Sequence, residues 1–132
     1  MKNAAIVGLV LCLALFLAPG TRASAGFKQP WDVTIDAVSR TAMGALGTAR
    51  NSADTRQALG CGVHYDAVNG KNNVNCNAAD AAGHTAQCAT QQAELIQIAL
   101  GINGDSFLEF EWDSSGECTN IQVVNSSIYA RK

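Results

Sequence analysis

The sequence predicts a small, mainly β domain, built as an antiparallel sandwich or meander with one short helix and two disulfides. Three observations support this prediction. Apolar and polar residues alternate with a period of two along several segments, turn sequences separate those segments, and four cysteines follow an N-terminal export signal. We expect residues 26–132 to form one domain, because a chain of this size supports a single hydrophobic core.

The first 25 residues are predicted to be a secretory signal peptide. Lys2 supplies a positive start, residues 4–18 are almost entirely apolar, and residues 23–25 (Ala-Ser-Ala) form the small-residue pattern that signal peptidase cleaves. An apolar run of about 15 residues is too short to span a bilayer comfortably. We therefore expect a secreted or periplasmic protein with no membrane insertion after cleavage.

The charge balance disfavours nucleic acid as a partner. The chain carries 9 basic and 11 acidic residues, and its formal net charge is −2. Removal of Lys2 and Arg22 with the signal leaves seven basic residues against eleven acidic ones, a net charge of −4. Because phosphate groups and anionic lipids bind basic surfaces, the expected partner is instead a protein or a glycan.

The cysteines indicate disulfides and not a metal site. Cys12 lies in the predicted signal, and the four that remain are Cys61, Cys76, Cys88 and Cys118. An even number of cysteines in an exported chain is typical of a disulfide framework. Neither their spacing nor the positions of His64 and His84 resemble a set of zinc ligands. We therefore predict two disulfides, no metal and no cofactor.

The first third of the predicted mature chain contains one clear strand signal. Residues 26–31 are expected to form a loose leader, and the alternation across residues 33–37 predicts a strand. Residues 39–48 fit either a closely packed strand or a weak helix. We favour a strand, because Gly44 and Gly47 would each weaken a helix by about 1 kcal/mol.

Two turns set the register of three strands between residues 61 and 88. The sequence of residues 80–83 (Asp-Ala-Ala-Gly) favours a type I turn followed by a left-handed glycine, which places Cys76 opposite Cys88. A loop at residues 67–70, closed by oppositely charged residues at 66 and 71, places Cys76 opposite Cys61. Cys76 therefore adjoins two other cysteines.

Both registers assign the same side chains to the same face of the sheet. One face is apolar and carries Cys61, Val63, Tyr65, Val74, Cys76, Ala78, Ala86 and Cys88. The other face is polar and carries Gly62, His64, Asp66, Lys71, Asn73, Asn75, Asn77, Thr85 and Gln87. This division is typical of an antiparallel meander with a single buried face.

Three disulfide pairings are possible for four cysteines. Because Cys76 lies next to both Cys61 and Cys88, it is expected to bond one of them while the other reaches Cys118. The turn types make Cys61 and Cys76 a non-hydrogen-bonded pair, in which side chains approach more closely. We therefore favour Cys61–Cys76 with Cys88–Cys118.

A helix and a second hairpin follow. Thr90 is a suitable N-cap for a helix over about residues 91–100, which is apolar over most of its circumference and is therefore expected to be well covered. Beyond it, a turn at residues 115–116 predicts a hairpin in which apolar residues pair. These pairs are Trp112 with Thr119, Phe110 with Ile121, and Leu108 with Val123.

The polar sheet face is the best candidate for a binding site. Its candidate residues are His64, Asp66, Asn73, Asn75 and Asn77. A histidine beside a carboxylate could also transfer protons near neutral pH, but an ordinary solvated sheet face has the same composition, and we favour that interpretation. We assign no catalytic residue, because no hydrolase, phosphate-loop or metalloprotease motif is present in the sequence.

Other polar and aromatic residues give weaker indications. Glu109 and Glu111 lie two residues apart on an outward face, a spacing compatible with glycoside hydrolysis or calcium binding, although a charged edge strand has the same pattern. Tyr65 and Trp112 fall on predicted core faces. Only Trp31 is expected to be exposed enough to stack on a sugar.

The cysteines and turn residues also carry a resemblance. The motifs are Gly60-Cys61, Asn75-Cys76-x-Ala78-x-Asp80-x-x-Gly83-x-x-x-x-Cys88 and Asp113-x-x-Gly116-x-Cys118-Thr119-x-Ile121-x-Val123-x-Asn125-Ser126. Over about residues 44–129 the chain resembles a loose group of small exported bacterial proteins with four mature cysteines and no assigned function. The resemblance implies export, disulfides and β architecture, and it implies no activity.

Three functional hypotheses follow. The first is an exported, non-catalytic module that binds a protein or glycan or belongs to a cell envelope or coat. The second is a small exported hydrolase that uses His64 with Asp66 or a glutamate. The third is an inhibitor of an exported enzyme, with the segment 67–72 as the inserting loop.

Overall fold

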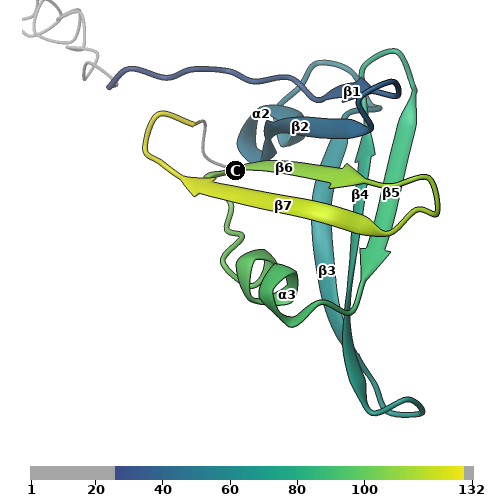
Figure 1. The fold of residues 1–132 in the computed structure, drawn as a ribbon. Helices are drawn as coiled ribbons and strands as arrows, with labels where there is room; N and C mark the ends of the chain where they lie inside the picture. Colours follow the sequence, from purple (N-terminus) through teal and green to yellow (C-terminus); the bar gives the residue numbers. More distant parts are fainter. Residues whose placement is uncertain (1–25, 130–132) are drawn as a thin grey trace, which may run out of the picture.

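The computed structural model describes residues 26–129, so the predicted signal peptide and the basic end at residues 131–132 lie outside the described residues. The described chain is mainly β, with two short helices (Figure 1). The elements are β1 (Thr34–Asp36), β2 (Thr41–Ala45), α2 (Leu46–Arg50), β3 (Ala58–Asp66), β4 (Lys71–Ala79), β5 (Thr85–Thr90), α3 (Ala93–Ala99), β6 (Ser106–Trp112) and β7 (Cys118–Asn125).

The strands form two antiparallel sheets. One sheet has four strands in the order β1-β2-β6-β7, and the other has three in the order β3-β4-β5. The core lies between them, and its largest fully buried side chains come from both sheets: Phe110, Leu108, Ile121 and Val74. The predicted small antiparallel β architecture is therefore confirmed. Neither helix in residues 26–129 is long and apolar enough to cross a membrane.

The three-stranded sheet has the predicted register. Cys76 lies opposite Cys61 on β3 and opposite Cys88 on β5. The two turns also follow the expected chemistry, because Gly70 and Gly83 adopt φ values of +66° and +92°, which favour glycine. Cys76 and Cys88 both face the core, with exposures of 1% and 4%.

Both predicted disulfides are present. Cys61–Cys76 joins β3 to β4 within one sheet, and Cys88–Cys118 joins β5 to β7 across the two sheets. A single parallel bridge between Ala89 and Glu117 continues the second connection at the edge of the three-stranded sheet. The sandwich is therefore held both within a layer and between layers.

The leader and the C-terminal segment cover one end of the outer face of the four-stranded sheet, around Phe107. The ring of Phe107 packs edge-on against Trp31 at 5.5 Å and stacks on Tyr129 at 5.7 Å between ring centroids. The backbone N–H of Gln29 donates to the carbonyl of Ile128 at 2.8 Å. Trp31 is exposed, as expected, with 39% of its surface accessible, while Phe107 and Tyr129 belong to a small second core.

The prediction of a strand over residues 39–48 was right for its first half and wrong for its second. Thr41–Ala45 is strand β2, whereas Leu46–Arg50 is helix α2. Glycine suits position 44 of this strand, because a Cβ there would lie 3.1 Å from the Cα of Val33. A propensity penalty at Gly47 was outweighed by packing, since Gly47 and Ala49 are buried.

The helix at residues 91–100 is shorter than predicted and begins later. It spans Ala93–Ala99, and its N-cap is Gln92, with no side-chain capping bond. Thr90 is not the cap because it belongs to β5, where its hydroxyl accepts the Gln92 N–H at 3.2 Å and donates to Glu117 at 3.2 Å. Leu100 follows the helix.

The predicted register of the C-terminal hairpin holds except near its turn. Phe110 pairs with Ile121 as expected, but Trp112 pairs with Cys118 and not with Thr119. An irregularity between Glu111 and Trp112 causes this one-residue shift. Alternation cannot predict it, because the Trp112 N–H donates to the carbonyl of Arg40 in the β1–β2 turn at 3.1 Å.

Candidate binding surfaces

The predicted polar residues share one face of the three-stranded sheet. Asn75 and Asn77 are exposed on β4, and Asn73 on the same face is half-buried. His64 is exposed on β3 directly opposite Asn73. Asp66 lies at the end of that strand, where it belongs to the hairpin turn. The structure therefore confirms the common face and spreads the five residues along its length.

Two hollows lie where the loop between β6 and β7 meets part of this face. One, of about 440 Å³, is lined by Asn73, Ala89, Thr90, Gln91, Ser115, Gly116 and Glu117. The adjoining one, of about 380 Å³, is lined by Asn75, Cys76, Asn77, Gln87, Cys88, Ala89, Ser115 and Gly116. We call the two together the amide hollows. Their contribution from residues 115–117 was not predicted from the sequence.

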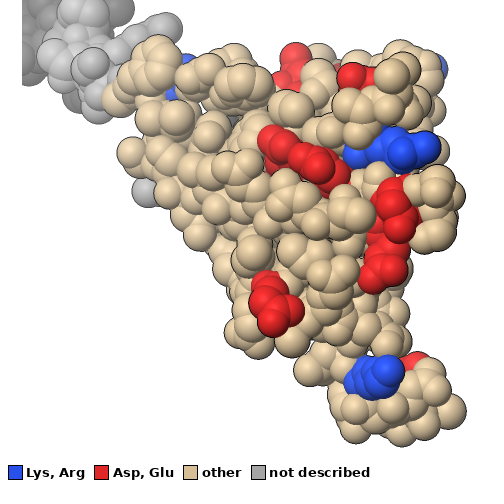
Figure 2. Space-filling model, in the orientation of Figure 1, with Lys and Arg blue, Asp and Glu red and all other residues tan. Residues whose placement is uncertain are grey.

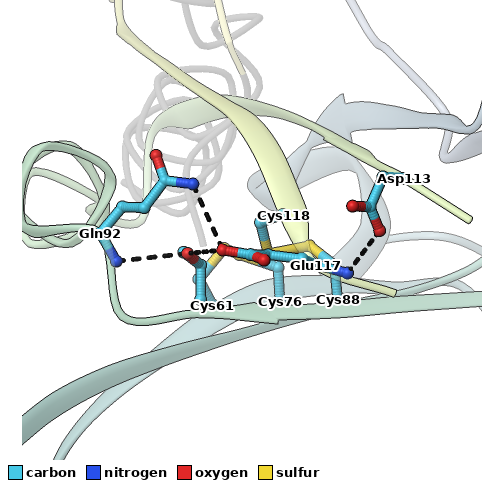
Figure 3. Close-up of a disulfide and its surroundings, with 8 residues drawn as sticks. Cys61, Cys76, Cys88, Gln92, Asp113, Glu117 and Cys118 are labelled. Atoms are coloured by element: carbon cyan, nitrogen blue, oxygen red, sulfur yellow. Dashed lines mark hydrogen bonds between the residues drawn. A yellow bond between two sulfur atoms is a disulfide. The ribbon is translucent and has the colours of Figure 1, made fainter. Parts of the chain in front are cut away.

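Hydrogen bonds hold one wall of the amide hollows. The Glu117 carboxylate accepts bonds from the Thr90 hydroxyl at 3.2 Å and the Gln92 amide at 3.3 Å (Figure 3). Asp113 accepts the Glu117 backbone N–H at 3.0 Å, which fixes the turn. The side-chain oxygen of Asn73 is buried without a hydrogen-bond partner. The hollows thus offer mainly amide and carboxylate groups.

The end of the β3–β4 hairpin extends beyond the third strand. β5 pairs only with Val74–Ala79, so residues 64–73 have no third strand beside them. We call residues 64–73 the arm, and it stands away from the rest of the molecule (Figures 1 and 2). Tyr65, predicted to be in the core, is 62% exposed here, because nothing lies over this part of the apolar face. Val68 at the tip is 94% exposed.

A network at Asp66 orders the tip of the arm. Its carboxylate accepts the backbone N–H groups of Val68 at 2.9 Å and Asn69 at 3.3 Å, and the Asn69 side-chain amide donates to it at 2.5 Å. The Asn69 side-chain bond is the largest cause of the lowered Asp66 pKa, followed by the bonds from the backbone N–H groups of Val68 and Asn69. Asp66 therefore orders the turn rather than forming a proton-transfer pair with His64.

Helix α3 packs beside the arm and is less covered than predicted. Ile98 is 40% exposed and Leu100 is 60% exposed, because the helix buries mainly Leu95, Ile96 and Ala99. A hollow of about 360 Å³ lies between α3 and the beginning of β4. It is lined by Lys71, Asn72, Gln91, Ala93, Ile96 and Gln97. Helical spacing places Leu100 on the same side as Ala93 and Gln97.

The remaining candidates do not form a site. Glu109 and Glu111 face outward opposite Gln122 and Asn120, as predicted, and both are half-buried. The Asn120 side-chain amide donates to Glu111 at 3.4 Å. His84 binds its turn partner Asp80, with 2.7 Å between ring nitrogen and carboxylate, and this bond is the main cause of the lowered Asp80 pKa. These groups belong to ordinary strand and turn structure.

The chain matches no protein-family model, no curated protein and no solved structure. Two surfaces on the described residues are candidates for binding: the amide hollows, and the surface formed by the arm and α3. Sequence alternation identified the first surface but not the second, because alternation does not indicate where the covering layer ends. The apolar residues Ile98 and Leu100 on a short helix were the available signal for the second.

Proposed function

We propose that the chain is an exported, non-catalytic protein-binding module whose main binding surface is formed by the arm and α3. The observation that carries this proposal is the exposure of large apolar side chains on these two neighbouring elements. Tyr65, Val68 and Leu100 are 62%, 94% and 60% exposed. Large apolar side chains exposed on neighbouring elements support a protein-binding surface.

The polar groups around this surface also suit a protein partner. Lys71, Asn72 and Gln97 line the hollow between the arm and α3, and Ile96 supplies an apolar wall. An apolar centre with a polar rim is the usual composition of a protein interface, and tyrosine is enriched at such sites. Much of the face in Figure 2 carries no charged side chain, which also favours contact with protein.

Export is supported by the cysteines and the N-terminal sequence. Both disulfides form between residues that the fold places side by side, and stable structural disulfides are typical of oxidising compartments. Residues 1–25 have the sequence of a secretory signal. We therefore propose a secreted or periplasmic location.

Inhibition of an exported enzyme is a second candidate function, favoured by the shape of the arm. The arm ends in a turn whose geometry is held by the Asp66 carboxylate before any partner binds. Preorganisation of this kind lowers the entropic cost of inserting a loop into a cleft. A glycan is an alternative ligand for the amide hollows, whose lining is rich in hydrogen-bonding groups.

The hydrolase hypothesis has no such support. It required His64 to lie in a concave site beside a second titratable group. His64 is exposed on the arm and lines neither the amide hollows nor the hollow beside α3. The nearby Asp66 carboxylate is already occupied by the turn. We therefore do not propose hydrolysis.

Affinity capture with matched surface variants tests the proposal. The protein is immobilised and exposed to envelope and culture extracts of its source, and retained proteins are quantified. Val68→Asp and Leu100→Asp should abolish retention of the partner, because each places a charge in the apolar contact. Val38→Asp is the control, since Val38 is also 94% exposed but lies in the β1–β2 turn.

Some outcomes of this capture experiment would contradict the proposal. Equal retention by all variants would place the contact elsewhere, and loss only with Val38→Asp would place it at the other end of the molecule. Retention that depends instead on Asn75→Ala and Asn77→Ala would assign binding to the amide hollows. If the retained protein is an enzyme, residual activity in the complex decides whether the module inhibits it.

A further inference from the structure

The four cysteines form one cluster and not two separate disulfides. Cys61, Cys76 and Cys88 occupy directly opposed positions on three neighbouring strands. The sulfur of Cys76 lies within 4.8 Å of the sulfurs of both Cys88 and Cys118 (Figure 3). The two disulfides are therefore nearly in contact, and Cys76 is the member of the first that adjoins the second.

Access to the cluster is unequal. Cys76, Cys88 and Cys118 have exposures of 1%, 4% and 0%, whereas Cys61 is half-buried. Thiol–disulfide exchange requires that an attacking thiolate reach a sulfur. Because Cys61 is the most exposed of the four cysteines, we expect a small thiol from solution to attack it first.

We propose that the four cysteines form a thiol–disulfide exchange unit in which Cys76 passes reduction from Cys61 to Cys118. The substrate class is a small thiol or an exported dithiol. This inference concerns a different chemistry from the protein-binding proposal and does not depend on it. It rests on the order of the cysteines across the sheet, their sulfur distances and their unequal burial.

The steps balance in atoms and electrons. An external thiolate attacks the Cys61 sulfur, forms a mixed disulfide there, and releases Cys76 as a thiolate. Cys76 then attacks the Cys88 sulfur, a Cys76–Cys88 bond forms, and Cys118 leaves as a thiolate that takes up a proton. A second external thiol attacks the mixed disulfide, which frees Cys61 as a thiol and leaves the external thiols oxidised to their disulfide.

The register favours Cys88 as the sulfur that is attacked. Directly opposed residues on antiparallel strands have Cα atoms about 4.5–5.5 Å apart, which falls within the range that a disulfide spans. Cys76 and Cys88 meet this condition in the present register. After exchange the three-stranded sheet keeps one bridge, between β4 and β5, whereas the covalent link between the two sheets is lost.

Limited reduction of the purified protein tests the proposal. Glutathione is added in small excess, free thiols are trapped with an alkylating reagent at intervals, and peptides are mapped without further reduction. The expected early product carries the label on Cys61 and Cys118 and contains a Cys76–Cys88 crosslink. Labels confined to Cys61 and Cys76, with Cys88–Cys118 intact, would overturn the proposal.

Two single variants provide a matched pair that needs no reductant. Cys61→Ala leaves a free thiol at Cys76, and alkylation should label Cys118 as well as Cys76. Cys76→Ala leaves a free thiol at Cys61, which does not adjoin the second disulfide, so the label should stay on Cys61. Labelling of Cys76 alone in Cys61→Ala contradicts the proposal. If either variant fails to fold, the wild-type reduction products decide.

Discussion

The base and the tip of the β3–β4 hairpin have the same pairing but different surroundings. At the base, β5 pairs with Val74–Ala79 and the apolar face of these strands belongs to the hydrophobic core, so Val74 is fully buried. In the arm, the strands continue to pair but nothing covers the same face, and Tyr65 is 62% exposed. The comparison shows that strand pairing continues past the core, while burial ends where the neighbouring layer ends.

This difference separates the part of the hairpin that stabilises the fold from the part that we propose for binding. The base carries a disulfide and core side chains, so it supports the fold. The arm adds little buried area, and an isolated two-stranded ribbon is marginally stable in water. Its ordered turn and exposed apolar residues therefore contribute little to folding and are consistent with the binding role that we propose.

Removal of the disulfide between the two sheets should have the largest effect on the free energy of unfolding of the domain. Cys88–Cys118 closes a separation of 30 residues, for which loop-closure entropy gives about 3–4 kcal/mol. Cys88→Ala combined with Cys118→Ala should lower the free energy of unfolding by that amount in urea titration. Cys61→Ala with Cys76→Ala, across 15 residues, should cost about 3 kcal/mol. Unchanged unfolding midpoints would contradict the structural role of both disulfides.

Two valines of the same hairpin give an intermediate effect and a direct test of the comparison. Val74→Ala removes two buried methyl groups and leaves a cavity, which should cost about 2–3 kcal/mol of unfolding free energy. Val68→Ala should change it by less than about 0.5 kcal/mol, because Val68 is 94% exposed. If chemical denaturation showed equal losses of unfolding free energy for Val74→Ala and Val68→Ala, the arm would be part of the cooperatively unfolding core.

The smallest effect concerns acid pH. Asp54 has its pKa lowered to about 2, mainly because the Gln57 side chain donates to its carboxylate, and Gln57 in turn accepts the Val33 N–H. A lowered carboxyl pKa stabilises the fold above the unfolded value near 4, and this contribution is lost as the pH falls toward 2. The urea midpoint of the wild-type protein should therefore decrease as the pH falls from about 4 toward 2. The midpoint of Asp54→Ala should decrease less over the same range.

Asp66 provides the matched control for the arm. Its pKa is lowered by a similar turn network, but that network joins only residues of the arm. Asp66→Ala should therefore leave the global unfolding midpoint and its dependence on pH unchanged, while the turn becomes less ordered. If Asp66→Ala changed the pH dependence of the urea midpoint as much as Asp54→Ala does, the arm would unfold together with the rest of the domain.

The three-stranded sheet could be predicted because its signals are local. The turn residues near Gly70 and Gly83 fix two registers, and those registers determine which cysteines meet. The turn types then favoured Cys61–Cys76 over Cys76–Cys88, because they made Cys61 and Cys76 a non-hydrogen-bonded pair, and this pairing is confirmed. The polar face with Asn75 and Asn77 was predicted for the same reason, since a one-residue slip would reverse every side chain.

The features that were missed depend on contacts between distant segments. The exposure of Tyr65 depends on where the elements that cover the apolar face end, and the shift at Trp112 depends on the carbonyl of Arg40. The amide hollows require the turn at residues 115–117 to meet β5 from the other sheet. Periodicity within one segment contains no information about such contacts.

Backbone hydrogen exchange of the isolated protein tests the central comparison most directly. Amide groups of residues 64–73 should exchange about tenfold or more faster than those of Val74–Ala79, because the arm can open without unfolding the core. Rapid exchange in the arm together with strong protection in the base would support our account, in which an uncovered binding element extends from a disulfide-stabilised domain. Equal protection along the whole hairpin would contradict the account, because it would mean that the arm is covered or forms part of the core.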